Sequence, residues 1–143
     1  MFPTVDEQLH QIRRILTNIV APDVKSTYPA DTLREVIVAL EMLERGWDQV
    51  LPFLAWDNEQ MVVLLSEAMP LIGGELAARI RAATPATSEP TAATAAVHQR
   101  NLELRALLAD AVPRLTSHPE PYRRVTEHLR QRLARYPFTP APP

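Results

Sequence analysis

The sequence predicts an all-α protein, an antiparallel bundle of four main helices with additional short helices and proline kinks. Apolar residues recur at alternating spacings of three and four over several long segments, as on one face of a helix. No segment shows the alternating pattern of a strand between turn signals, and three glycines are too few for a hairpin-rich fold. Amphipathic helices bury their stripes against one another, which favours a bundle.

The first expected helix covers residues 5–20. Thr4 and Glu7 have the spacing of a capping box, in which each satisfies a backbone N–H of the other. Pro22 ends this helix, since proline cannot continue the hydrogen-bond ladder. One apolar stripe runs along the helix through Val5, Leu9, Ile12, Leu16 and Ile19.

A second helix is expected from about Asp31. Gly46 weakens it, and Pro52 kinks or ends it because proline lacks a donor and clashes with the preceding turn. The stripe consists of Leu33, Ile37, Leu40, Leu43, Trp47, Leu51 and Leu54.

Asp57 is then expected to cap a third helix over residues 58–69, because Gln60 holds the third position after it. Pro70 and the pair Gly73-Gly74 close that helix, and a short helix follows over residues 75–83.

Residues 84–94 are rich in Pro, Thr and Ala and predict a flexible connection inside one domain of residues 1–138, because neither flank has a complete core. A helix over residues 95–115 follows, with a kink at Pro113. Residues 139–143 are expected to form a disordered tail.

The last helix is expected to begin near Ser117, which forms a capping-box pattern with Glu120, and to run to about Arg135. Its apolar side carries Tyr122, Val125, Leu129, Leu133 and Tyr136.

Composition narrows the function classes. The chain has no cysteine, which excludes disulfides, thiolate metal sites and cysteine nucleophiles. Apolar runs fall short of the roughly 18 residues of a membrane span, and Asp6 and Glu7 interrupt any signal-peptide pattern. We therefore expect a cytoplasmic protein without a membrane partner. The pI near 6.1 and an acidic first half argue against nucleic acid as a partner.

Polar residues on the expected helices have more than one interpretation. Asn101 lies on the apolar stripe of the helix over residues 95–115. It is either a core residue that bonds to a neighbouring carbonyl, or a register device at an interface together with Arg105 one turn on. Arg100, next to it, is included among the candidate interface residues.

The last helix surrounds its apolar seam with five arginines: Arg123, Arg124, Arg130, Arg132 and Arg135. This basic face is either solvated, or a docking surface for an acidic partner or a phosphate-bearing ligand. Trp47, Phe53 and Trp56 flank Pro52 and form either core or an exposed docking patch, since Trp and Arg are common interface anchors.

Candidate catalytic sets are weak. The four histidines show no metal-ligand spacing, no glycine-rich phosphate loop is present, and Ser26, Ser66 and Ser117 lack a nucleophile context. Arg123 and His128 match the loose Arg-x4-His pattern of HEPN-type RNases, and Arg124 would share a helix face with His128. A HEPN-like RNase that uses Arg124 and His128 is thus an alternative.

Three short motifs together resemble an uncharacterised family of small bacterial helical proteins. They are Ile-Arg-Arg-Ile-Leu with Val-Ala-Pro, at residues 12–16 and 20–22; Arg-Asn-x-x-Leu-Arg-x-Leu-Leu, at residues 100–108; and His-Leu-Arg-x-Arg with Tyr-Pro-Phe, at residues 128–132 and 136–138. Members of this family resemble the small subunit of hydroxyacyl-CoA kinases whose large subunit has an aminoglycoside-phosphotransferase-like fold.

The resemblance implies a non-catalytic accessory subunit that binds a kinase-like protein in acyl-CoA metabolism. ATP and magnesium would then be bound by the partner, with no cofactor in this chain, and a contact with the CoA moiety of a substrate stays open. A stand-alone homo-oligomeric bundle is a further alternative. The candidate interface residues are Trp47, Phe53, Trp56, Arg100, Asn101, Arg105, Arg124, Arg130 and Arg132.

Overall fold

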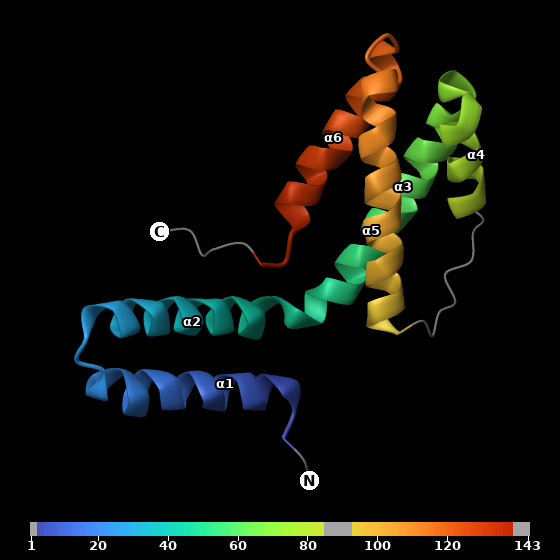
Figure 1. The fold of residues 1–143 in the computed structure, drawn as a ribbon. Coiled ribbons are helices and arrows are strands. Elements are labelled where there is room, and N and C mark those ends of the chain that lie inside the picture. Colours follow the sequence, from blue (N-terminus) through green and yellow to red (C-terminus); the bar gives the residue numbers. More distant parts are fainter. Residues whose placement is uncertain (1–2, 85–92, 139–143) are drawn as a thin grey trace. The chain divides into compact units, whose positions relative to one another are not determined.

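A computed structural model describes residues 3–84 and 93–138, and these residues form helices and turns without a strand (Figure 1). The prediction of an all-α protein is confirmed. Most of the expected connection at 84–94 and the expected tail at 139–143 lie outside the described residues. Contacts divide the chain into two compact units, Met1–Gln49 with Pro137–Pro143, and Val50–Tyr136. We call them the α1–α2 unit and the α3–α6 unit; the single domain over 1–138 stays a prediction.

In the part of the chain that the structure describes, no helix has both the length and the apolar character that crossing a membrane requires.

The first helix, α1, spans Val5–Ile15 and has the expected capping box. The N–H of Glu7 donates to Thr4 Oγ1 at 3.3 Å, and the N–H of Thr4 donates to Glu7 Oε2 at 2.8 Å. The α-helix ends earlier than expected, because the chain widens into a π-helical turn over Leu16–Val20 and then tightens into a 3-10 turn over Ala21–Asp23. The α-helical hydrogen-bond ladder therefore stops before Pro22 is reached.

The second helix, α2, spans Thr27–Gly46 and is followed by a 3-10 turn over Trp47–Gln49. It begins before the expected Asp31 because Pro29 lies in the first helical turn, where a missing N–H costs little. Gly46 has a packing role: a Cβ at this position would collide with the carbonyl oxygen of Pro137.

Helices α1 and α2 form an antiparallel hairpin (Figure 1). Arg13 Nε donates to Glu44 Oε2 at 2.6 Å, and His10 Nδ1 lies 2.9 Å from Glu44 Oε1. Among the described residues of this unit only Gly46 is buried, so the hairpin has no core of its own.

The third helix, α3, runs without interruption over Val50–Ile72 and corrects three expectations. Pro52 neither ends nor separates a helix, because it falls in the first turn, where backbone N–H groups have no intrahelical partner. Asp57 is not an N-cap but an interior residue whose side chain is buried. The expected short helix over 58–69 is the central part of this longer one.

Gly73 and Gly74 separate α3 from α4, which spans Gly74–Ala83. Their φ values of +65° and +63° lie in the left-handed region, which only glycine adopts without strain. The sequence pattern placed the break at the two glycines correctly, whereas Pro70, which was also expected to close the helix, lies inside α3.

Helix α5 spans Thr94–Ala111 and ends before the expected residue 115, because Pro113 lies in a 3-10 turn over Val112–Arg114. Helix α6 spans Pro119–Arg135, which confirms its expected end. Its N-cap position is His118 rather than Ser117, and no side chain caps it. The expected capping box of Ser117 and Glu120 is therefore wrong.

Helix α3 is the centre of its unit and packs against α4, α5 and α6, while α4 also packs against α5 (Figure 1). Every buried hydrophobic residue that the structure describes belongs to this unit. The main cluster contains Met61, Leu64, Leu65, Ala68, Leu76, Ile80, Leu104, Leu107, Leu108, Ala111, Leu115 and Val125.

Candidate functional site

A buried polar network joins α3, α5 and α6 at one end of this core. Asp57 Oδ2 accepts hydrogen bonds from Asn101 Nδ2 at 2.7 Å and from Arg132 Nε at 2.9 Å. Asn101 Nδ2 also donates to Asn58 Oδ1 at 2.9 Å, and Asn58 Nδ2 donates to the carbonyl of Val97 at 3.2 Å. Asp57 and Asn101 are 0% and 1% exposed, so water cannot replace these partners. The network therefore connects three helices through groups that need one another.

His128 approaches the other oxygen of Asp57. Its Nε2 lies 3.0 Å from Asp57 Oδ1, within ion-pair range, but the atoms are poorly aligned for a hydrogen bond. Both ring nitrogens and Oδ1 are buried without a well-aligned partner. We therefore treat this contact as an electrostatic attraction rather than as a formed hydrogen bond.

Two opposing effects set the pKa of Asp57. Burial raises the pKa, because a low-dielectric surrounding disfavours the charged carboxylate. The contacts with His128, Asn101 and Arg132 act in the other direction and outweigh burial, so the pKa of Asp57 lies below its ordinary value. The carboxylate is thus ionised at neutral pH and neutralises the guanidinium of Arg132.

Aromatic rings and arginines form a layer next to this network. The guanidinium of Arg132 lies 5.5 Å from the ring centre of Phe53, and that of Arg135 lies 4.3 Å from the ring centre of Trp56. Phe53 contacts Tyr136 edge to face at 5.8 Å, and Trp56 lies 5.5 Å from the His128 ring. Cations above aromatic faces are attracted by the ring quadrupole, so this layer fixes the end of α6 against the start of α3.

The network and the adjacent aromatic layer contain four of the candidate interface residues. Asn101 and Arg132 donate hydrogen bonds to Asp57. Phe53 lies against Arg132, and Trp56 lies against the His128 ring. Asn101 is indeed a core residue on the stripe, but its partners are side chains of the same chain, and Arg105 takes no part in the network.

The remaining candidates lie elsewhere. Trp47 belongs to the α1–α2 unit, where its Nε1 donates to Asp6 Oδ1. Arg100 is half-buried, and its Nε is buried without a hydrogen-bond partner. Arg124 forms an ion pair with Glu67, and Arg130 lies 3.6 Å from Glu127 on the surface. The basic face of α6 is thus largely paired with acidic groups of the same unit.

The sequence analysis missed the central role of Asp57 and Asn58, and named His128 only for the RNase alternative. A signal was present. Asp57 lies four residues after Phe53 and four before Met61, on the apolar stripe of α3, as Asn101 does on that of α5. Interpreting Asp57 as a helix cap hid this pattern.

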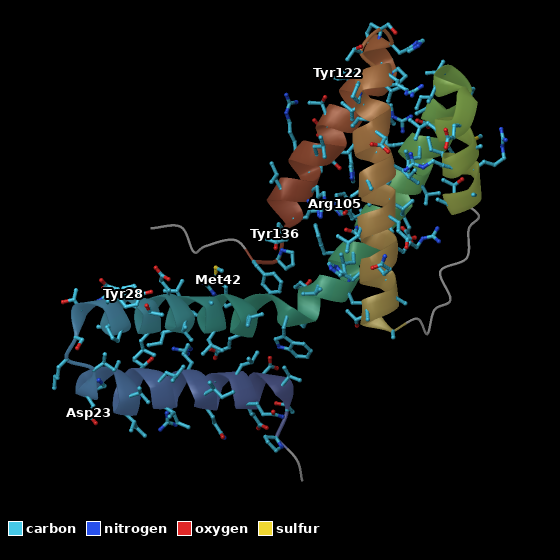
Figure 2. All side chains as sticks on the ribbon, in the orientation of Figure 1. Asp23, Tyr28, Met42, Arg105, Tyr122 and Tyr136 are labelled. Carbon is cyan, nitrogen blue, oxygen red and sulfur yellow. The ribbon has the colours of Figure 1, made fainter. Side chains whose placement is uncertain are left out.

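Two hollows open on either side of His128. The first has a volume of about 260 Å³ and is lined by Gln60, Val63, Leu64, Arg123, Arg124, Glu127, His128 and Gln131. The second has a volume of about 220 Å³ and is lined by Met61, Arg105, Leu108, Ala109, Val112, His128, Leu129 and Arg132. Arg105 lies on the side of α5 that faces this second hollow (Figure 2).

The chemistry of these residues favours structure and binding. Within residues 3–84 and 93–138, no group of three or more His, Cys, Asp or Glu side chains is arranged to hold a metal ion. The ring nitrogens of His128 are covered by the protein, although the ring borders both hollows. Asp57 and its partners hold three helices in one register, which is the best-attested use of buried polar groups.

No family model, curated protein or solved structure matches this chain.

Proposed function

We propose that this protein is a non-catalytic accessory subunit that binds and stabilises a kinase-like partner of aminoglycoside-phosphotransferase fold, acting on hydroxyacyl-CoA. The observation that carries the interaction role is an uncharged, largely apolar face on the α1–α2 hairpin. The class of partner rests on the family resemblance of the sequence.

Each helix of the hairpin has two adjacent stripes. The contact stripe is half-buried in the hairpin and contains Leu9, Leu16, Leu33, Ile37 and Leu40. The second stripe precedes the contact stripe by one residue on both helices. It is exposed and carries no charged residue. It contains Gln8, Ile12, Ile15, Ile19, Thr32, Val36, Ala39 and Leu43. The exposed fractions of Ile12, Ile15 and Ile19 are 46%, 50% and 64%.

The two exposed stripes belong to one face. A shift of one residue rotates a helical position by about 100°. Because α1 and α2 run in opposite directions and face each other, the same backward shift moves both stripes to the same side of the hairpin. Glu44 pairs with His10 and Arg13, and none of these three charged residues belongs to the exposed stripes, so that side of the hairpin carries no charge.

A face of this kind favours a protein partner. Two helices share only one contact, so a hairpin alone cannot cover a second stripe, and contiguous exposed apolar surface marks interaction sites. The finer part of the fold expected from the sequence, one antiparallel bundle formed by the four main helices of this chain, stays a prediction.

Co-expression with the kinase-like protein encoded beside it tests the proposal. We expect the two proteins to co-purify and the kinase to lose activity or solubility without this subunit. The double variant Ile12→Glu with Ile15→Glu should abolish co-purification, since it places two charges in an apolar contact. The matched control is Thr17→Glu, an exposed position on the opposite side of the hairpin, which should leave the complex intact.

Two results would contradict the proposal. One is a kinase that is equally active and soluble alone and does not retain this protein. The other is a loss of stability in the Ile15→Ala variant of the isolated monomer as large as that of a core truncation, which would show that the face is already covered within the chain. Sedimentation of the isolated protein tests the remaining alternative, a stable homo-oligomer.

The RNase alternative has one supporting observation, because Arg124 and His128 line the same 260 Å³ hollow. Against it stand the ion pair of Arg124 with Glu67 and the covered ring nitrogens of His128. Incubation with a structured RNA tests it: cleavage that the His128→Ala variant abolishes would favour the nuclease, and intact RNA would exclude it.

A further inference from the structure

The geometry of the α3–α6 unit points to a binding site for a small aliphatic carboxylic acid in the 220 Å³ hollow between α5 and α6, with its carboxylate on Arg105. This inference does not depend on the proposed kinase-like partner, because the site lies within one unit of this chain.

The wall of the hollow is mainly apolar. Met61 of α3 lies at its base, Leu108 and Ala109 of α5 form one side, and Leu129 of α6 forms the other. Leu129 is 45% exposed, so apolar surface is available to a ligand at the opening. Small-molecule sites typically combine such walls with a few convergent polar groups.

The polar groups of the hollow are cationic or neutral, and no acidic side chain lines it. Arg132 is already neutralised by Asp57. Arg105 has no ion-pair or hydrogen-bond partner among the residues that the structure describes. His128 is 95% buried at the inner wall, and its ring nitrogens are covered by the protein, so the ring adds surface but no polar contact to the hollow. The net charge that a ligand meets is therefore that of the Arg105 guanidinium.

The hollow on the other side of His128 differs in its charged groups, and this difference decides which of the two hollows can bind an anion. It also contains two arginines, but Arg123 is paired with Glu120 and Arg124 with Glu67, and Glu127 lines the wall. Both arginines there are already neutralised by a carboxylate, and a further carboxylate lines the wall, so an anion would find no uncompensated cation. Of these two hollows, the one at Arg105 combines an apolar wall with an uncompensated cation.

The ligand class follows from these properties. A guanidinium and a carboxylate can form two parallel hydrogen bonds, which neutralise the charge and fix the orientation of the ligand. The volume of about 220 Å³ holds a chain of roughly six carbons, if each heavy atom takes about the 30 Å³ of a water molecule in the liquid. Hexanoate is thus a suitable probe.

Titration of the full chain with sodium hexanoate, followed by backbone amide NMR, tests the inference. We expect saturable shifts at Arg105, Leu108 and Leu129, and at least tenfold weaker binding of 1-hexanol and hexylamine, which share the chain but lack the carboxylate. Arg105→Gln should reduce hexanoate binding to the level of 1-hexanol.

Two further variants complete the experiment. Arg114→Gln removes an exposed arginine that does not line the hollow and should bind hexanoate like the unmodified protein. Ala109→Leu fills the hollow from an exposed helix position, so it should block binding while the amide spectrum stays folded. Equal binding of hexanoate and 1-hexanol, undiminished binding by Arg105→Gln, or equal losses in Arg105→Gln and Arg114→Gln would overturn the inference.

Discussion

The helices of the two units of this chain are packed in different ways. In the α3–α6 unit, four helices enclose an apolar core and a polar network in which Asp57 contacts Asn101, His128 and Arg132. In the α1–α2 unit, two helices share a half-buried contact stripe and an exposed ion-pair edge, and no apolar side chain among the described residues of the unit is buried. The difference teaches that amphipathic sequence alone does not make a core: a helix must be contacted on more than one side.

The two tryptophans allow the units to be followed separately, since Trp47 belongs to the hairpin and Trp56 to the α3–α6 unit. The variant Trp47→Phe leaves one fluorophore in the α3–α6 unit, and we use it as the background for the stability measurements on that unit. Circular dichroism reports on both units together.

The largest effect is expected for Asp57→Ala. The substitution leaves the guanidinium of Arg132 and the His128 ring without their carboxylate, and breaking a buried ion pair costs about 3–5 kcal/mol. Urea unfolding followed by Trp56 fluorescence measures the loss. The control Asp110→Ala removes an exposed carboxylate that pairs with Arg79 and should cost less than about 1 kcal/mol. Similar losses of unfolding free energy in both variants would mean that the buried network contributes no more to stability than an exposed ion pair does.

The next largest difference in stability between the two units is expected when an apolar side chain is truncated to alanine. Leu65→Ala removes a fully buried side chain of α3, and such a change costs about 2–5 kcal/mol through lost transfer energy and a cavity. Ile15→Ala in the hairpin removes a half-exposed side chain and should change the unfolding free energy of the isolated protein by less than about 1 kcal/mol. If Ile15→Ala costs as much as Leu65→Ala, the hairpin face is covered in solution, and the contrast between the units fails.

A smaller effect is expected for Gly46→Ala, which tests the one close approach inside the α1–α2 unit. The added Cβ would collide with the carbonyl oxygen of Pro137, and overpacking of this kind costs about 1–3 kcal/mol. Helix propensity alone would make alanine the better residue by about 1 kcal/mol. A stabilised variant in thermal circular dichroism would therefore show that residues near Pro137 do not pack on α2.

The smallest effect is a pH dependence confined to the α3–α6 unit. Because the pKa of Asp57 is lower in the folded chain than in the unfolded chain, ionisation of this carboxylate stabilises the fold above about pH 4, its ordinary pKa. That stabilisation is lost as the pH falls through the lower pKa of the folded state. Urea midpoints from Trp56 fluorescence between pH 7 and pH 3 should decline, and Asp57→Asn should flatten the curve. An unchanged slope in Asp57→Asn would assign it to other carboxylates.

Local features of the fold could be predicted well from the sequence. The capping box of Thr4 and Glu7, the break at Gly73 and Gly74 and the end of α6 depend on a few neighbouring residues, and each was found where it was expected. Prolines were harder, because the same residue ends a helix in its interior but fits its first turn, and only the start of the helix decides between the two. Pro52 was misjudged for this reason.

The candidate site shows the same limit. Periodicity put Asn101 on an apolar stripe, and it would have put Asp57 there as well, because both are properties of one helix. Whether the side chains of Asn101 and Asp57 meet depends on how α3, α5 and α6 cross. The same crossing makes Arg132, rather than Arg105, the cation of the network. The sequence alone determined an all-α chain, the break at Gly73 and Gly74, the end of α6 and the place of Asn101 on an apolar stripe, because these follow from local spacing and chemistry. Only the tertiary structure decided which polar groups share a buried charge and which stripe stays exposed, because burial is a property of the surroundings that other helices provide.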